Sequence, residues 1–223
     1  MEKNPLIVIF LGKSGAGKGT QVNLIKEKYN LEKISSGDLL RERKKTPDFT
    51  GEKISKTIDN GGIVLTPVIF KLWMEKLEEY KKNKDFQGLI FDGSPRKIKE
   101  AYLMEEALEW YEWNKNIKVI LLDISDEEVV KRIALRKICP HCGNIIIDAP
   151  DGIEELVCSQ CGSKLERRPE DTEAGVRKRL EWFQKEVQPV INYYEEAGCL
   201  IRINGEQSIE NVFQDIIKSI QED

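Results

Sequence analysis

Near its N-terminus the chain reads LIVIFLGKSGAGKGT over residues 6–20. The unbroken apolar run 6–11 is typical of a strand that is buried on both faces of a parallel sheet. The glycines that follow it allow backbone N–H groups to wrap closely around phosphate oxygens. Lys18 adds a positive charge there, and the next helix presents its N-terminus to the same place. This stretch therefore predicts a phosphate-binding loop between a strand and a helix.

Strand and helix patterns alternate along the rest of the chain. Apolar runs that indicate strands occupy 89–91, 119–122 and 199–203, with a weaker run at 32–35. Helical patterns occupy 18–29, 37–45, 51–60, 67–82, 97–113, 126–137, 172–196 and 208–221. We therefore predict an α/β, P-loop three-layer fold with a parallel sheet of about five strands, whose functional loops lie at the carboxyl ends of the strands.

The composition narrows the class of protein. Of 223 residues, 40% are hydrophobic and 33% are charged, which is typical of a globular domain. The formal net charge is -4 although the chain has 35 Lys and Arg, so we expect the cations to gather at an anion site rather than to form a nucleic-acid face. No apolar run approaches the ~18 residues of a membrane span. We expect a cytoplasmic monomer with neither a membrane nor a nucleic-acid partner.

Two cysteine pairs stand in a stretch without helical periodicity. CPHC at 139–142 and CSQC at 158–161 each end next to a glycine. Two such CxxC knuckles offer four thiolates, the ligand set of a closed structural zinc site. A redox-active pair and an iron–sulfur site are the alternatives. His141 lies inside the first knuckle, where we expect an exposed side chain rather than a ligand.

Four motifs, in order, carry a resemblance to a known family. They are GKGTQ at 17–21, ISSGDLLR at 34–41, FDGSPR at 91–96, and RPED at 168–171 followed by VRKRL at 176–180. Together they resemble the adenylate kinase family of nucleoside monophosphate kinases, over nearly the whole chain. The resemblance implies that the chain moves the terminal phosphoryl group of ATP, with Mg²⁺, to a nucleoside monophosphate.

The resemblance also implies a division of the chain. A P-loop core would comprise 1–35, 67–137 and 168–223. A helical monophosphate-binding subdomain would occupy 36–66, and a zinc-binding lid would occupy 138–167.

The matched motifs imply roles for particular residues. The catalytic group would be Lys18, Arg136, Arg168, Arg179 and Asp92. Asp92, together with Asp38, would orient water around Mg²⁺. ATP would be bound by Gly15, Ala16, Gly17, Lys18, Gly19, Thr20, Arg132, Arg136 and Gln207. The monophosphate would be bound by Ser36, Arg41, Gly62, Ile63, Val64, Gly93, Arg96, Glu100, Arg168 and Arg179. The metal ligands would be Cys139, Cys142, Cys158 and Cys161.

Glu100 leaves the identity of the acceptor open. AMP-using members of the family have Gln at the matched position, and that amide can both donate to N1 and accept from N6 of adenine. A carboxylate suits the two donors of guanine better. The resemblance favours AMP, and GMP or a pyrimidine monophosphate is the alternative.

Two other classes of function are disfavoured. A nucleic-acid reader built on the zinc knuckles predicts basic and aromatic residues between Cys142 and Cys158, but that segment has acidic residues and no aromatic one. A P-loop switch that only hydrolyses its nucleotide would not need Arg41 and Arg96, which imply a second phosphate group.

Overall fold

The computed structural model describes residues 4–59, 62–143, 145–146, 157–167 and 171–222. Its main sheet has five parallel strands in the order β2-β3-β1-β4-β7. The strands are β1 (Leu6–Gly12), β2 (Glu32–Ser35), β3 (Gly88–Asp92), β4 (Ile117–Asp123) and β7 (Leu200–Asn204). The predicted parallel α/β sheet is therefore confirmed, including its short strand at 32–35.

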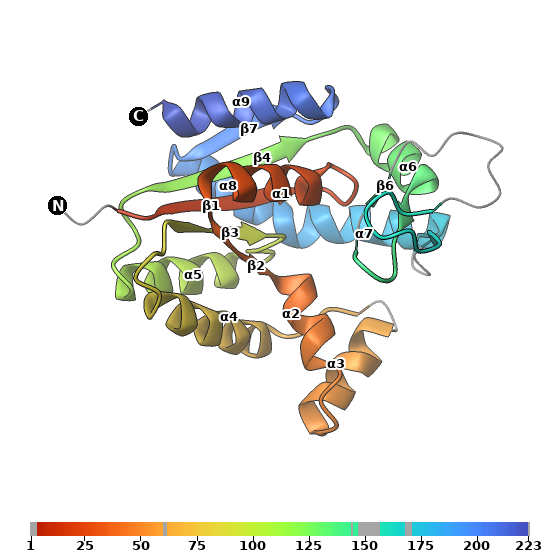
Figure 1. Ribbon diagram of the computed structural model, residues 1–223, viewed down its shortest axis with the longest axis horizontal. Helices are drawn as coiled ribbons and strands as arrows, with labels where there is room; N and C mark the ends of the chain where they lie inside the picture. Colours follow the sequence, from red (N-terminus) through yellow and green to blue (C-terminus); the bar gives the residue numbers. More distant parts are fainter. Residues whose placement is uncertain (1–3, 60–61, 144, 147–156, 168–170, 223) are drawn as a thin grey trace.

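Alternate residues of β1 build two separate cores. Val8 and Phe10 pack toward α1 (Lys18–Tyr29) and α9 (Ile209–Gln221) on one face. Residues 7, 9 and 11 pack on the other face, which is covered by α4 (Thr66–Lys81), α5 (Ile98–Trp110) and α8 (Gln188–Glu196). Figure 1 shows the resulting layers, with α9 above the sheet and α4 and α5 below it. Burial of both faces explains the unbroken apolar run of β1.

The carboxyl ends of the strands meet at one end of the molecule. Ser35 pairs with Asp92 across β2 and β3, and Phe10 pairs with Asp92 across β1 and β3. The chain leaves β2 into α2 (Ser36–Arg43) and α3 (Phe49–Asp59), and leaves β4 into α6 (Asp126–Leu135). In Figure 1 these helices lie at the same end of the sheet as α7 (Glu173–Trp182). Loops from distant parts of the sequence are thereby brought to one edge.

A small antiparallel unit lies at this end as well. It pairs β5 (Lys137–Ile138) with β6 (Ile145–Ile146), and bridges join Ile138 to Glu166 and Val157 to Lys164. The described residues of 138–167 contain no helix, as the sequence predicts.

The helix predicted over 172–196 is interrupted. A π-helical turn, η1 (Phe183–Val187), separates α7 from α8. The Gln188 N–H donates to the Phe183 carbonyl, five residues back. The next residue is Pro189, which has no N–H with which to continue an α-helical ladder, so the wider turn fits the sequence there.

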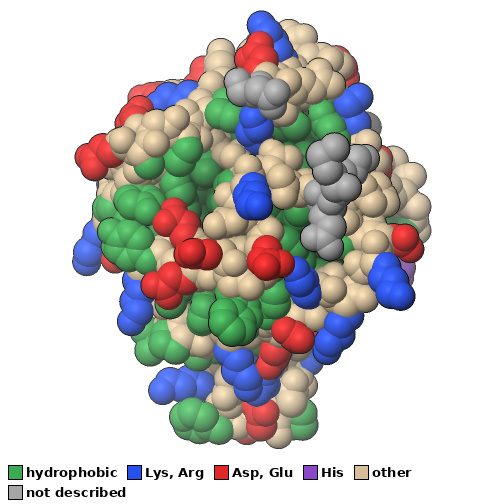
Figure 2. Space-filling view, turned by 90° about the vertical axis from the view of Figure 1, so that its left-hand side faces the viewer, with side chains coloured by type: hydrophobic (Ala, Val, Ile, Leu, Met, Phe, Trp, Pro, Cys, Tyr) green, Lys and Arg blue, Asp and Glu red, His purple; other side chains and the backbone are tan. Residues whose placement is uncertain are grey.

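Each helix in the described part of the chain is too short or too polar to cross a membrane. Figure 2 views the end of the molecule that faces left in Figure 1, where the main strands begin. Lys and Arg side chains stand there among acidic and apolar ones, without a continuous basic face.

The start of β3 provides a test of the fold. Gly88 has φ of 152°, and a Cβ on it would lie 2.0 Å from the Leu6 carbonyl oxygen. Gly198 is a matched control, because its φ is 70° and no atom lies within 4 Å of its Cβ position. We expect Gly88→Ala to lower the free energy of unfolding by about 3 kcal/mol, and Gly198→Ala by about 1 kcal/mol. Urea unfolding measures both, and equal losses would contradict the close approach of β1 and β3.

Candidate active site

The loop between β1 and α1 has the geometry of an anion site. Gly15 and Gly17 have φ of 86° and 88°, in the left-handed region that favours glycine. Gly17 caps α1, whose first turn has no acidic residue and no side-chain cap. No acidic side chain of that turn therefore competes with an external anion for its N–H groups. The predicted phosphate-binding residues lie in this loop and the first turn of α1: Gly15, Ala16, Gly17, Lys18, Gly19 and Thr20.

Lys18 lies within this loop. Its Nζ donates to the carbonyl oxygens of residues 12 and 13, at 2.7 and 2.8 Å. Burial lowers the pKa of the Lys18 ammonium to about 8. Asp92, at the end of β3, raises that pKa, whereas the positive charges of Arg96 and Arg136 lower it. Two other cations therefore act on Lys18, and a bound polyanion would relieve this repulsion.

Arg41 is held on α2 by an acidic neighbour. Its guanidinium donates to Asp38 at 2.5 Å, and Lys33 lies 3.5 Å from the same carboxylate. Burial by itself would raise the pKa of Asp38, but the hydrogen bond and charge of Arg41, with Lys33, hold it below its usual value. The Asp38 N–H is in turn capped by the Ser35 hydroxyl. Asp38 is thus engaged with two cations.

Arg96 follows β3 in a loop that Glu100 braces. The Arg96 Nε donates to the Gly93 carbonyl at 2.6 Å, and the guanidinium lies 5.9 Å from the centre of the Trp182 ring. Glu100 is buried, and its carboxylate accepts the Arg96 backbone N–H at 2.8 Å and the Thr66 hydroxyl at 3.4 Å. Both oxygens of Glu100 therefore have protein partners.

Asp171 joins two of the predicted catalytic arginines. Its side chain is 1% exposed, and it accepts two hydrogen bonds from Arg136, at 2.6 and 2.8 Å. Arg179 donates to the same carboxylate at 3.1 Å. Burial would raise the pKa of Asp171, but the hydrogen bonds and charges of Arg136 and Arg179 lower it below its usual value. The motif that contains Asp171 can be recognised in the sequence, but the role of this acid cannot. Only the fold shows that the two arginines converge on it.

The residues predicted for the donor base lie beside the P-loop. The Arg132 Nε donates to Glu128 at 2.7 Å, one turn earlier on α6. The Cβ position of Gly15 is 3.8 Å from the Arg132 Cβ, so α6 packs directly against the phosphate loop. Gln207 lies in the turn after β7 and donates to the Asn204 carbonyl and to Asp215.

The other predicted acceptor residues are placed as follows. Gly62 and Ile63 are exposed and Val64 is half-buried, just before α4, and the Gly62 N–H donates to the Thr57 carbonyl at 2.8 Å. Ser36 is buried at the start of α2. Arg168 lies outside the described residues.

The four predicted metal ligands converge. The Sγ atoms of Cys139, Cys142, Cys158 and Cys161 all lie within 4.8 Å of one another. Two of the separations are 3.4 and 3.5 Å. Zn–S bonds of about 2.3 Å in a tetrahedron need sulfur atoms about 3.8 Å apart, so the cluster fits zinc. Hydrogen bonds from the Ser163 side chain and backbone lower the pKa of the Cys161 thiol to about 5, which favours the thiolate that a metal needs.

The unit around this cluster has little apolar core. Its buried hydrophobic cluster consists of Cys139, Cys158 and Leu165, with Ile146 packed against them, among the residues described there. Two of these three buried side chains are themselves predicted ligands. The sulfur cluster therefore takes the place of a core in this segment.

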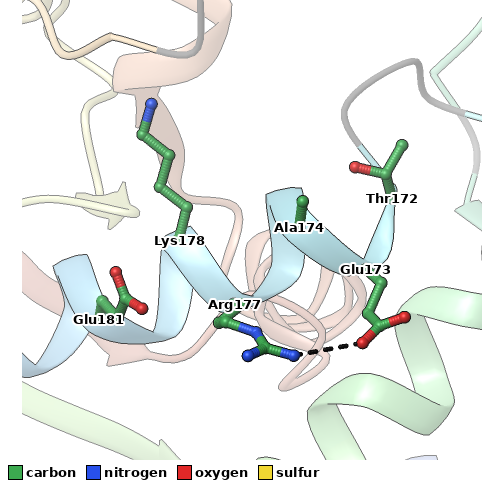
Figure 3. Close-up of a pocket in the computed structure, with 6 residues that line it drawn as sticks. All are labelled: Thr172, Glu173, Ala174, Arg177, Lys178 and Glu181. Atoms are coloured by element: carbon green, nitrogen blue, oxygen red, sulfur yellow. Dashed lines mark hydrogen bonds and ion pairs between the residues drawn. The ribbon is translucent and has the colours of Figure 1, made fainter.

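A hollow lies beside α7. It is lined by Thr172, Glu173, Ala174, Arg177, Lys178 and Glu181 (Figure 3). Arg177 pairs with Glu173 on its wall at 3.3 Å. Its lining includes Thr172 and Lys178, the sequence neighbours of Asp171 and Arg179, and no residue of the P-loop.

Comparisons with known proteins agree with the site. The family model described as adenylate kinase matches residues 10–199. The adenylate kinase of Chlamydia trachomatis serovar D is 37% identical, over 99% of this chain and 92% of its own. That of Archaeoglobus fulgidus is 37% identical over 94% and 95%, and that of Chlamydia felis is 38% identical over the whole of both chains. With this full-length likeness and a P-loop that faces a set of arginines, the chain belongs to the adenylate kinase family.

Proposed function

We propose that the chain catalyses the transfer of a phosphoryl group from ATP to AMP, which yields two ADP. The observation that carries this proposal is the position of Lys18 and Arg96 after the neighbouring parallel strands β1 and β3, at one edge of the sheet. The positive charges of Arg96 and Arg136 both lower the pKa of Lys18 there. Arg41 and Arg96 lie on segments other than the P-loop, and a second phosphate group is what these two arginines would bind. The relatives that match this chain end to end carry the name adenylate kinase.

The donor, ATP, occupies the P-loop in this proposal. Backbone N–H groups of residues 15–20 bind its phosphates, and Lys18 exchanges its carbonyl partners for phosphate oxygens. Arg132, which Glu128 holds by Nε, stacks on the donor base, and Gln207 borders that base from the turn after β7. Asp92 is the residue that would hold the waters around Mg²⁺, and the ion would screen the charge of the donor phosphates.

The acceptor, AMP, occupies the opposite side. Arg41 and Arg96 bind its phosphate, because a planar guanidinium matches phosphate oxygens and remains charged. Its base lies between residues 62–64 and the buried wall formed by Ser36 and the Gly93 turn.

The transfer itself requires positioning and charge stabilisation. An oxygen of the AMP phosphate attacks the γ-phosphorus of ATP, and the bond from that phosphorus to the β,γ-bridging oxygen breaks. The attacking oxygen is already anionic, so no general base is needed. Lys18, Arg136, Arg168 and Arg179 stabilise the charge on the moving group. Asp171 holds Arg136 and Arg179 in place before the nucleotide arrives.

The two inserts close over the nucleotides in this proposal. Residues 36–66 move with the acceptor, and residues 138–167 form a lid with Arg136 and Arg168 at its two ends. Closure excludes water, and water is the competing acceptor of the phosphoryl group. The remaining core comprises 1–35, 67–137 and 168–223.

We propose that the lid metal is zinc with a structural role. Four thiolates leave no open coordination position for chemistry, and metal binding would replace the missing apolar core. Because this ligand set requires reduced cysteines, we place the protein in the cytoplasm. We also propose a monomer, since exposed apolar side chains such as Phe49, Trp110 and Ile209 belong to different helices.

Acceptor choice tests the function directly. With ATP-Mg²⁺, we expect AMP to be phosphorylated about tenfold or more faster than GMP, CMP or UMP, measured as kcat/KM from nucleotide product formation. Both oxygens of Glu100 are engaged by the protein, so Glu100→Gln should keep AMP as the best acceptor. Glu109→Gln, exposed on the same helix, is the control. If GMP is the best acceptor and Glu100→Gln moves the preference to AMP, Glu100 reads the base and the AMP assignment is wrong. Hydrolysis of ATP without phosphorylation of any monophosphate would refute the function.

Metal analysis tests the lid. We expect about one zinc per chain and, after chelation, a lower thermal midpoint and a lower kcat, because the lid loses the linkage between its two cysteine pairs. Cys161→Ser should lose the metal, whereas His141→Asn, a substitution at an exposed position in the same knuckle, should keep it. Zinc-free protein that retains both its midpoint and its kcat would contradict the structural role.

A further inference from the structure

A buried chain of hydrogen bonds links three elements beneath the proposed acceptor site. The Trp73 indole N–H, on α4, donates to the Ser36 hydroxyl at 3.1 Å. The Ser36 hydroxyl, at the first residue of α2, is hydrogen-bonded to the Ser94 hydroxyl in the loop after β3. The three residues are 1%, 4% and 1% exposed. Buried polar groups that satisfy one another hold their elements in a defined arrangement.

The position of this contact relates it to the two acceptor arginines. Ser35 and Asp92 are the last paired residues of β2 and β3. Beyond them the chain leaves the sheet as two separate segments, α2 with Arg41 and the 93–97 loop with Arg96. The contact between Ser36 and Ser94 joins these segments directly after the sheet pairing ends.

The two arginines also influence each other across this gap. The surrounding groups desolvate the Arg96 guanidinium and lower its pKa, Glu100 and Asp92 oppose that effect, and the charge of Arg41 lowers the pKa further. The two cations therefore repel each other in the free protein. An arrangement that holds them at a fixed separation must be maintained by other contacts, and the Ser36–Ser94 contact is placed to do this.

Trp73 anchors the chain of contacts in the core. Its ring packs edge-on against Phe91 of β3 at 6.0 Å and against Phe70 at 6.3 Å between ring centres. These apolar contacts fix the orientation of the indole, so its N–H points toward the Ser36 hydroxyl in a fixed direction. The hydroxyls of Ser36 and Ser94 are oriented in turn by the same hydrogen bonds, which are the only ones their side chains make among the described residues.

We propose that Ser94 is a positioning residue for the acceptor phosphate: through its hydrogen bond to Ser36, it sets the spacing between Arg41 and Arg96. This inference rests on the proposed function, since it assumes a monophosphate between the two arginines. Ser94 itself does not touch the phosphate. Its loss should weaken AMP binding by allowing α2 and the 93–97 loop to move apart, and should leave the P-loop unaffected.

A double-mutant cycle tests the proposal. We expect Ser94→Ala to raise the Kd and the KM for AMP about 5- to 10-fold and to change the KM for ATP less than twofold. If the hydroxyls act through each other, Ser36→Ala with Ser94→Ala should be no worse than Ser36→Ala alone. Ser219→Ala, which removes a hydroxyl bonded only to the Ile216 carbonyl of α9, is the control and should change neither constant.

The Kd for AMP is measured without ATP, from the Trp73 indole N–H cross-peak in ¹⁵N–¹H correlation spectra, identified by its loss in Trp73→Phe. Ser94→Ala should shift this peak in the free protein, because the partner of its acceptor is removed. The proposal is overturned if Ser94→Ala changes only the thermal midpoint, if it weakens AMP and ATP equally, or if the two substitutions act additively. Because binding is read apart from turnover, wild-type protein that binds AMP without phosphorylating it would refute the proposed function and still test this inference.

Discussion

Several positively charged side chains lie at one edge of the parallel sheet, and the arrangement of the acidic residues around them depends on this. The positive charges of Arg96 and Arg136 both lower the pKa of Lys18 at this edge. Such a set is unfavourable unless carboxylates hold its members apart and in place. Asp171 does this for Arg136 and Arg179, Asp38 for Arg41, and the Glu100 carboxylate braces the backbone of Arg96.

These carboxylates differ in how firmly they hold their arginines. Asp171 is nearly inaccessible to solvent and binds Arg136 through two hydrogen bonds, so breaking this pair would leave a buried charge without compensation. The Asp38–Arg41 pair is more than half exposed, and an exposed pair contributes only about 0–1 kcal/mol. Arg41 can therefore leave Asp38 for a phosphate at little cost, whereas Arg136 is positioned in advance. This difference supports the proposed roles, in which Arg41 binds the acceptor phosphate and Arg136 lies at one end of the lid.

Much of the fold was predictable because the signals were local. A run such as 6–11 is readable as a doubly buried strand, and the glycines and lysine that follow it predict the loop. The break in the helix over 172–196 was not predicted, because its apolar spacing continues and only Pro189 marks the change in hydrogen bonding. Among the proposed site residues, those in contiguous motifs were predicted from the sequence. Asp171 and the Ser36–Ser94 contact were missed because their partners lie far away in the sequence, and only the register of β2 and β3 brings the two serines together.

The central claim is that these cations serve two nucleotides and that the phosphoryl group passes between them rather than to water. The measurement that tests it most directly follows the label from [γ-³²P]ATP in the presence of AMP and Mg²⁺. The account predicts that the label appears in the β-position of ADP formed from AMP, with almost none released as inorganic phosphate. Label released mainly as inorganic phosphate, with AMP unchanged, would contradict it and would mean that the arginines serve a hydrolase.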